Sequence, residues 1–160
     1  MRITISPIAA EDNPFIAKII RSTLEEFNAN KCGTVYYDSS TDHLHELFQK
    51  DRSGYYIARV DEKIVGGGGL FPSDGLPEDT CELVKMYLLP EARGTGIGAK
   101  LILQAMETAR SFGFKRMYIE TMPELKKAMT VYEKFGFSYL DAPMGNTGHH
   151  GCSIWMCGNL

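Results

Sequence analysis

The sequence predicts a layered α/β (α+β) fold, in which helices cover the faces of one mixed β-sheet. Segments typical of strands alternate with segments of helical apolar spacing, in the order β-α-α-β-β-β-α-β-α-β-β. The length of 160 residues suits one domain, and the 44% hydrophobic and 23% charged residues are ordinary for a globular protein. No internal repeat or linker interrupts the pattern. We therefore expect residues 1–160 to form a single domain.

The first 48 residues predict one strand and two helices. Residues 2–7 alternate like a strand and end at a proline. Residues 11–27 predict a helix, because apolar side chains recur at helical spacing behind an Asp-Asn cap with proline in the first turn. A polar loop follows at residues 28–41. A shorter helix is expected at residues 40–48, capped by its first hydroxyl residues.

The middle of the chain predicts three strands and the start of a helix. Strands at residues 54–60 and 63–71 are joined by Asp-Glu, and a long polar loop at 72–80 follows them. The next strand is expected at residues 81–89. A glycine-rich turn then opens a helix whose apolar residues line one face over residues 97–109.

The last part of the chain predicts one helix and three more strands. Residues 115–121 are typical of a strand. Residues 123–137 indicate a helix that stops at Gly136, since glycine commonly ends helices. Strands at residues 137–141 and 152–157 complete the sheet, with a loop between them.

Charge and composition exclude several classes of protein. There are 17 Lys and Arg against 20 Asp and Glu, a net charge of −3, so no strongly basic field exists to attract nucleic acid. The first ten residues lack the apolar core of a signal peptide, and no run approaches the roughly 18 apolar residues of a membrane span. None of the four cysteines forms a CxxC motif. We expect no nucleic-acid or membrane partner, reduced thiols and a cytoplasmic location.

Two glycine-rich runs are candidates for phosphate binding. The run VGGGG at 65–69 continues as a strand and has no helix behind it. We interpret it as a strand whose missing side chains let a backbone or a ligand come close. The run RGTGIG at 93–98 leads directly into a helix, whose N-terminus offers unpaired N–H groups and a positive dipole end. The second run is therefore the predicted phosphate loop.

Two common phosphate motifs fit this loop poorly. No Walker sequence is present. The dinucleotide motif GxGxxA is matched by Gly94, Gly96 and Ala99, and Glu120 ends the next strand, where a ribose-binding acid could lie. However, residues 89–93 separate the first glycine from its strand, and only 40 residues follow Glu120, too few for the rest of such a sheet. A NAD-binding oxidoreductase is the weaker alternative.

The loop and its surroundings resemble the GNAT N-acetyltransferase family. Residues 93–98 match the family's pyrophosphate loop, R/Q-x-x-G-x-G/A. Residues 82–98 resemble its central strand, the break in that strand and the loop, and AMTVYEKFGF at 128–137 resembles its next helix. Residues 55–69 are similar to the hairpin before this core. The resemblance covers roughly residues 2–140.

This resemblance implies a fold and a co-substrate. The fold would be a mostly antiparallel sheet of about seven strands flanked by about four helices, with a parallel strand pair that splays apart at the cofactor site. The co-substrate would be acetyl-CoA, with no metal. The lack of an N–H at Pro90 suits the place where strand pairing stops. The residues implied in acetyl-CoA binding are Met86, Tyr87, Leu88, Arg93, Gly94, Thr95, Gly96, Ile97 and Gly98.

The implied reaction is direct acetyl transfer to a primary amine, which needs a base because an alkylamine has a pKa near ~10.4. Glu82 matches the family's catalytic glutamate, and Glu120 is a second candidate. Tyr132 matches the tyrosine that donates to the departing sulfur, and the amide of Leu88 would help to hold the thioester oxygen. Leu125 stands where many relatives have an asparagine that contacts the cofactor, so we do not expect that contact.

The acceptor is the least specified part. His149 and His150 precede the last strand and could act as base or contact the substrate, and Tyr36 and Tyr37 would form the opposite wall. The acceptor would be a small-molecule or peptide amine, and a homodimer is compatible with the sequence. The main alternative is a non-catalytic acyl-CoA-binding or sensor domain that keeps the loop without turnover.

Overall fold

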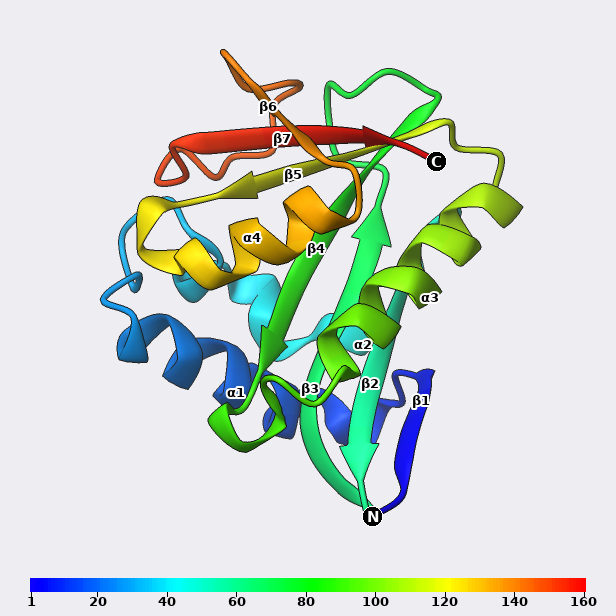
Figure 1. The fold of residues 1–160 in the computed structure, drawn as a ribbon, viewed down its shortest axis with the longest axis vertical. Helices are drawn as coiled ribbons and strands as arrows, with labels where there is room; N and C mark the ends of the chain where they lie inside the picture. The colour runs from blue at the N-terminus through cyan, green and yellow to red at the C-terminus, as the bar shows by residue number, and fades with distance from the viewer.

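The computed structural model describes all 160 residues and contains the strands and helices in the predicted order (Figure 1). The strands are β1 (Ile3–Pro7), β2 (Gly54–Val60), β3 (Lys63–Phe71), β4 (Thr80–Leu88), β5 (Arg116–Thr121), β6 (Ser138–Leu140) and β7 (Ile154–Asn159). The helices are α1 (Asn13–Glu26), α2 (Leu44–Leu47), α3 (Ile97–Ser111) and α4 (Lys126–Lys134). None of these helices combines the length and the apolar character that a membrane crossing requires.

The sheet has seven strands in the order β1-β2-β3-β4-β5-β7-β6, and helices cover both of its faces. Helices α3 and α4 pack on one face through a core cluster that includes Leu70, Leu83 and Met106. Helices α1 and α2 cover the other face, around Ile20 and Tyr55. The predicted layered fold of seven strands and four helices is confirmed.

Strands β4 and β5 form the one parallel pair, and they separate after a short contact. Only Thr80, Cys81 and Glu82 of β4 pair with β5. Beyond this point β4 continues alongside β3, whereas β5 continues alongside β7, so β5, β7 and β6 fan away from β4 (Figure 1). The splayed parallel pair is therefore present, and Glu82 is the last β4 residue before the gap.

The glycines of the VGGGG run form the centre of β3, where neighbouring atoms leave no room for side chains. A Cβ added at Gly66 would lie 2.3 Å from the backbone oxygen of Tyr87, and one at Gly67 would lie 2.7 Å from the Tyr55 ring. The Tyr55 hydroxyl, which comes from β2, donates to the backbone oxygen of Lys85 in β4 at 2.7 Å. The interpretation of this run as a strand that allows close approach is confirmed.

A β-bulge interrupts β4 opposite these glycines. The pairing passes from Gly69–Val84 directly to Gly67–Tyr87, so two residues of β4 face one residue of β3. The first of the two, Lys85, has a φ of 52°, in the left-handed region that residues with a Cβ rarely adopt. Bulges of this kind turn a side chain away from the direction that strand alternation would give it.

The helix predicted at residues 40–48 is shorter than expected. Residues Ser39–Asp42 form a 3-10 turn, and only α2 is α-helical. The hydroxyl of Thr41 donates to a backbone oxygen of the preceding loop at 2.8 Å instead of capping a helix. The side chain of Asn13, expected to cap α1, accepts the amide of His45 in α2 at 2.8 Å. The polar side chains satisfy neighbouring segments, which the local sequence does not reveal.

Candidate active site

The predicted phosphate loop presents a row of free amides at the N-terminus of α3. Gly94 and Gly96 have φ angles of 73° and 87°, which glycine adopts without steric cost. The amides of residues 94–99 donate to no backbone acceptor, and the first bonded amide of this turn is that of Lys100, which donates to Gly96. Free N–H groups at the positive end of a helix fit a phosphate group.

Arg93 is engaged with the protein itself. Its guanidinium contacts both carboxylate oxygens of Glu26, at the end of α1, at 2.7 and 3.0 Å. It also donates to the backbone oxygen of Leu88, at 3.2 and 3.0 Å. The side chain thus ties the phosphate loop to α1 and to the end of β4. Its direct contact with a pyrophosphate stays a prediction.

The end of β4 offers one free backbone edge to the gap. The amide of Leu89 donates to Val65 of β3 at 2.8 Å. Because N–H groups alternate in direction along a strand, the amide of Leu88 points away from β3, toward the gap beside β5. The side chains of Met86 and Tyr87 pack into the cores on opposite faces of the sheet. The geometry suits a pantetheine arm along this edge.

Tyr132 of α4 is buried, with 6% of its surface exposed, and its ring packs against that of Phe137. Burial raises the pKa of its hydroxyl to about 12, and no hydrogen bond contributes to that shift. The hydroxyl therefore keeps its proton at neutral pH and is available as a donor. Leu125 packs against the apolar core and supplies no polar contact in the place of the family's asparagine.

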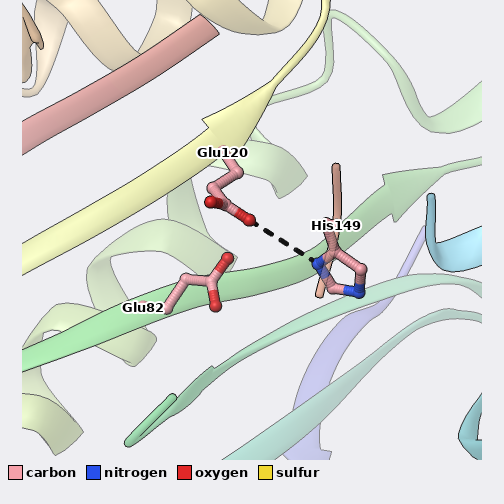
Figure 2. A group of neighbouring side chains, drawn as sticks. All are labelled: Glu82, Glu120 and His149. Carbon is pink, nitrogen blue, oxygen red and sulfur yellow. Dashed lines mark ion pairs between the residues drawn. The ribbon is translucent and has the colours of Figure 1, made fainter. Parts of the chain in front are cut away.

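Two glutamates and a histidine meet beside the gap (Figure 2). Glu82 is 4% exposed, and the Ser73 hydroxyl donates to it at 2.5 Å. Burial raises the pKa of Glu82 to about 7, although the Ser73 hydrogen bond opposes the shift. Glu120, at the end of β5, accepts from the Tyr118 hydroxyl at 2.8 Å and from the hydroxyl of Thr147. Glu82 is thus a carboxyl group that gains and loses a proton near neutral pH.

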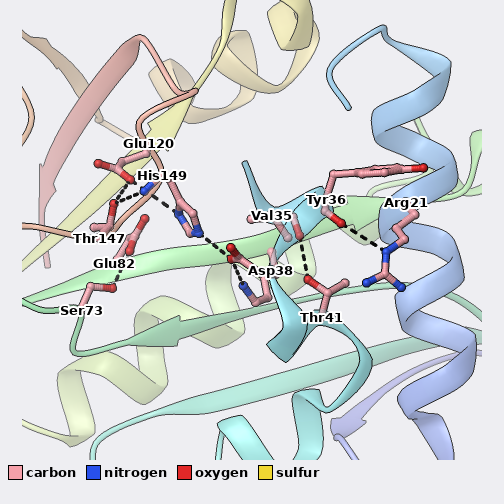
Figure 3. A network of polar contacts seen from close by, with 11 residues as sticks. Arg21, Val35, Tyr36, Asp38, Thr41, Ser73, Glu82, Glu120, Thr147 and His149 are labelled. Atoms are coloured by element: carbon pink, nitrogen blue, oxygen red, sulfur yellow. Dashed lines mark hydrogen bonds and ion pairs between the residues drawn. The ribbon is translucent and has the colours of Figure 1, made fainter. Parts of the chain in front are cut away.

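His149 links this pair of glutamates to Asp38 (Figure 3). Its Nε2 lies 2.7 Å from the Asp38 carboxylate, and its Nδ1 lies 3.7 Å from Glu120. Burial disfavours the charged imidazole, but the hydrogen bond and charge of Asp38 outweigh burial and raise the pKa of His149. The pKa of Asp38 is lowered despite its burial, because His149 hydrogen-bonds to it and adds a positive charge. Nε2 is therefore the donor, and Asp38 fixes the direction of the ring.

A cavity of about 160 Å³ opens beside Glu82 on the α2 face of the sheet. It has an apolar wall and a polar wall. The apolar lining residues are Leu47, Phe48, Phe71 and Val84. The polar and charged lining residues are Asp38, Ser73, Asp74, Glu82, Lys85, Asn146, Thr147 and His149. A small molecule with a polar reacting group and an apolar part would suit this cavity.

Three loops from distant parts of the sequence close around the cavity. The amide of Gly151 donates to Gly33 at 2.9 Å, which joins the last loop to the 28–41 loop. The amide of Asn146 donates to Asp74 at 2.7 Å, which joins the last loop to the hairpin loop after β3. These backbone contacts hold the segment that carries His149.

The structure brings only part of the predicted acceptor wall to the cavity. The ring of His150 packs against Gly33 instead of lining the cavity, so the two histidines point to different places. Tyr36 and Tyr37 contact each other, with ring centroids 5.0 Å apart, and do not line the cavity either. Their loop contributes Asp38 in their place. Substrate contacts of the two tyrosines and of His150 stay predictions without support from this geometry.

The cavity is also lined by residues that were not anticipated from the sequence, among them Asp38, Ser73, Lys85 and Thr147. For Asp38 one signal existed, since it directly follows the two loop tyrosines. Ser73 and Thr147 lie in polar loops, where single hydroxyls carry no recognisable pattern. Lys85 lies on a strand whose bulge the sequence does not announce.

The cluster also has the composition of a metal site. One ligand atom each from Glu82, Glu120 and His149 lie within 4.8 Å of one another. The other ring nitrogen of His149, Nε2, donates a hydrogen bond to Asp38, and metal-bound histidines commonly make such a bond. These residues could hold a divalent cation, and the absence of a metal from the reaction stays a prediction.

A splayed parallel strand pair, followed by a glycine loop of free amides at a helix N-terminus, defines an acyltransferase fold of the GNAT type. The sequence model described as "Acetyltransferase (GNAT) family" matches residues 17–137. The N-acetyltransferase YjgM of Escherichia coli K12, itself uncharacterized, is 42% identical over 155 residues, which cover 96% of this chain and 92% of YjgM. The chain therefore belongs to the GNAT acetyltransferase family.

Solved structures show the same fold at low sequence identity. A GNAT-family acetyltransferase from Staphylococcus aureus Mu50 superposes with a TM-score of 0.86 at 20% identity, with 99% of each chain covered. The PaiA N-acetyltransferase from Thermoplasma acidophilum, solved in complex with coenzyme A, gives a TM-score of 0.78 at 19% identity over the whole of both chains. This fold is not a dinucleotide-binding sheet, so the GxGxxA spacing of the loop does not indicate an oxidoreductase.

Proposed function

We propose that this protein transfers the acetyl group of acetyl-CoA directly to the primary amine of a small acceptor bound beside Glu82. The placement of Glu82 carries the proposal. It is the last residue of β4 that pairs with β5, it lines the cavity, and its pKa of about 7 lets it accept a proton at neutral pH. A base at the point where the strands separate lies between the expected donor site and the acceptor cavity.

The donor site fits the chemistry of coenzyme A. The free amides of residues 94–99 would hold the pyrophosphate, and the open edge at residues 86–88 would pair with the pantetheine arm. Acetyl-CoA, when bound, supplies a thioester carbonyl that an amine can attack. The complex of the Thermoplasma protein with coenzyme A, in the same fold, supports this donor.

Glu82 would serve as the general base. An alkylamine with a pKa near ~10.4 costs roughly 4 to 5 kcal/mol to deprotonate at pH 7, so a positioned proton acceptor is needed. Glu82 is about half ionised at that pH, given its pKa of about 7. Glu120, held by Tyr118 and Thr147, would attract the ammonium form of the acceptor and orient it toward Glu82.

Two further groups of the protein would stabilise the charges that develop. The amide of Leu88 points into the gap, where it can donate to the carbonyl oxygen. The hydroxyl of Tyr132 keeps its proton, because its pKa is about 12, and can give it to the departing sulfur.

We also propose a cytoplasmic location, since the four cysteines form no disulfide.

The test is a panel of primary amines assayed for acetyl-CoA-dependent thiol release. We expect the wild-type protein to turn over at least one amine, and Glu82→Gln to lose about 100- to 10,000-fold in kcat/KM as a missing general base does. Glu107→Gln, which changes an exposed glutamate on α3, is the matched control and should keep full activity. Binding of acetyl-CoA, seen as thermal stabilisation, without consumption by any amine would favour the sensor alternative.

A further inference from the structure

Lys85 has a largely buried side chain whose ammonium group has no hydrogen-bonding partner within the protein. Its side chain is 5% exposed, and its nearest acidic atom is Oδ2 of Asp38 at 3.8 Å, too far for a hydrogen bond. Lys85 lines the cavity beside Glu82. Every fully buried side-chain nitrogen or oxygen has a partner, so this unpartnered ammonium group keeps access to the cavity, where a ligand group of opposite charge could bind it.

The bulge in β4 directs this side chain into the cavity. Val84 and Lys85 are neighbours in the sequence and would face opposite sides of a regular strand. Both line the same cavity, because Lys85 adopts a φ of 52° within the bulge. The left-handed conformation is strained for a residue that has a Cβ. The fold sustains this strain through the glycines of β3 and the hydrogen bond from Tyr55 to the Lys85 backbone.

The carboxylate nearest to Lys85 is already engaged by another residue. Asp38 is the acidic group nearest to it, and His149 already holds that carboxylate at 2.7 Å. Lys85 therefore shares its nearest carboxylate with His149. Glu82 lines the same cavity, and the carboxylate of Glu120, which does not line it, lies within 4.8 Å of that of Glu82, so the two form a negative site. A cationic and an anionic site side by side match a molecule that carries both charges close together.

We propose that the acceptor is an amine that also carries a carboxylate, as an amino acid does, with the carboxylate on Lys85 and the amine facing Glu82. This inference rests on the acetyl transfer proposed above. Lys85 and Glu82 are three residues apart on one strand, so a short molecule reaches both. The volume of about 160 Å³ lies below the roughly 300 to 1,000 Å³ of pockets for drug-sized ligands, which favours a single amino acid over a peptide. The apolar wall, including Phe48 and Phe71, would receive an aliphatic or aromatic side chain.

The test compares matched pairs of ligands that differ only in the carboxylate: alanine and ethylamine, leucine and 3-methylbutylamine, phenylalanine and 2-phenylethylamine. Each is titrated by calorimetry into the protein saturated with coenzyme A, so binding is measured without turnover. We expect the amino acid of at least one pair to bind about 10- to 100-fold more tightly than its amine, as for a hydrogen-bonded ion pair. Lys85→Met should abolish that difference, and Lys85→Arg should retain part of it.

Lys18→Met, which removes an exposed lysine of α1, is the matched control and should leave the preference unchanged. Equal affinity within every pair in the wild-type protein would overturn the inference, and that comparison needs no variant to fold. A preference that survives Lys85→Met, or tighter binding of 1-aminoethylphosphonate than of alanine, would also overturn it. Failure of the wild-type protein to acetylate any amine, despite such a preference, would count against the proposed function instead.

Discussion

Replacing Glu82 by glutamine removes the buried carboxyl group of the cavity and keeps its size, so the variant isolates the effect of that ionisation on folding. In the folded protein burial raises the pKa of Glu82 from 4.5 to about 7. The folded state then binds this proton more tightly than the unfolded state. The resulting stabilisation is complete below the unfolded pKa and is lost as the pH rises through the folded pKa.

The size of the effect follows from these two pKa values. The full difference of about 2.5 units corresponds to roughly 3 kcal/mol at about 1.4 kcal/mol per unit. Between pH 5 and pH 7 the wild-type protein should lose about 2 kcal/mol from this group. The Glu82→Gln variant has no ionisable group at this position, so its free energy of unfolding does not fall for this reason. Its free energy of unfolding, relative to that of the wild type, should therefore increase by about 2 kcal/mol over this interval.

The assay is urea unfolding of both proteins at pH 5, 6, 7 and 8, followed by circular dichroism. Glu107→Gln, at an exposed position, should stay parallel to the wild type throughout. A difference between Glu82→Gln and wild type that does not vary with pH would refute the reasoning. It would mean that the carboxyl group of Glu82 is solvated, and its role as a base near neutral pH would lose its physical basis.

Four other outcomes are expected. Tyr132→Phe should lower kcat about 100-fold with little change in the KM for acetyl-CoA, since only the proton donor is lost; equal kcat values in steady-state assays would contradict this. Ser73→Ala should shift the acidic limb of the pH–rate profile to higher pH by about one pH unit. In the wild type the Ser73 hydroxyl stabilises the ionised form of Glu82, so its removal raises the pKa of Glu82; an unchanged limb would contradict this. Tyr55→Phe should lower the free energy of unfolding by about 1 to 2 kcal/mol in urea, because the backbone oxygen of Lys85 loses its buried donor. Dialysis against EDTA should leave turnover unchanged, and a loss restored by zinc would show that a metal takes part.

The order of the elements and the geometry of the phosphate loop could be predicted, because they follow from local patterns. Periodicity locates strands and helices, and the phosphate loop needs glycines directly before a helix. The family resemblance pointed to Glu82 and Glu120, and the structure places their carboxylates close together, while their catalytic roles stay predictions.

The acceptor half depends on contacts between distant segments, which the sequence pattern does not encode. His149 and His150 are neighbours, yet only His149 faces the cavity, because the ring of His150 packs against Gly33. The loop of Tyr36 and Tyr37 was expected to form a wall of the acceptor site, but Asp38 is the residue of this loop that lines the cavity. The cavity wall formed by Lys85 depends on a one-residue bulge, which changes side-chain direction without changing the strand pattern.

The expected donor site is built from strands and helices, whereas loops close much of the cavity, and this difference affects how acceptor preference can change. The groups expected to bind the donor lie on strands, on helices or at their ends: the phosphate loop, the open edge of β4 and Tyr132. Changes in these elements would disturb the core. Much of the cavity is closed by three surface loops that are held to one another by backbone hydrogen bonds, and backbone contacts tolerate many side chains. Exchange of these loops between relatives should therefore transfer acceptor choice while leaving the use of the donor intact. Under the proposed acetyl transfer, that separation makes the three loops a compact target for engineering new acceptor specificity.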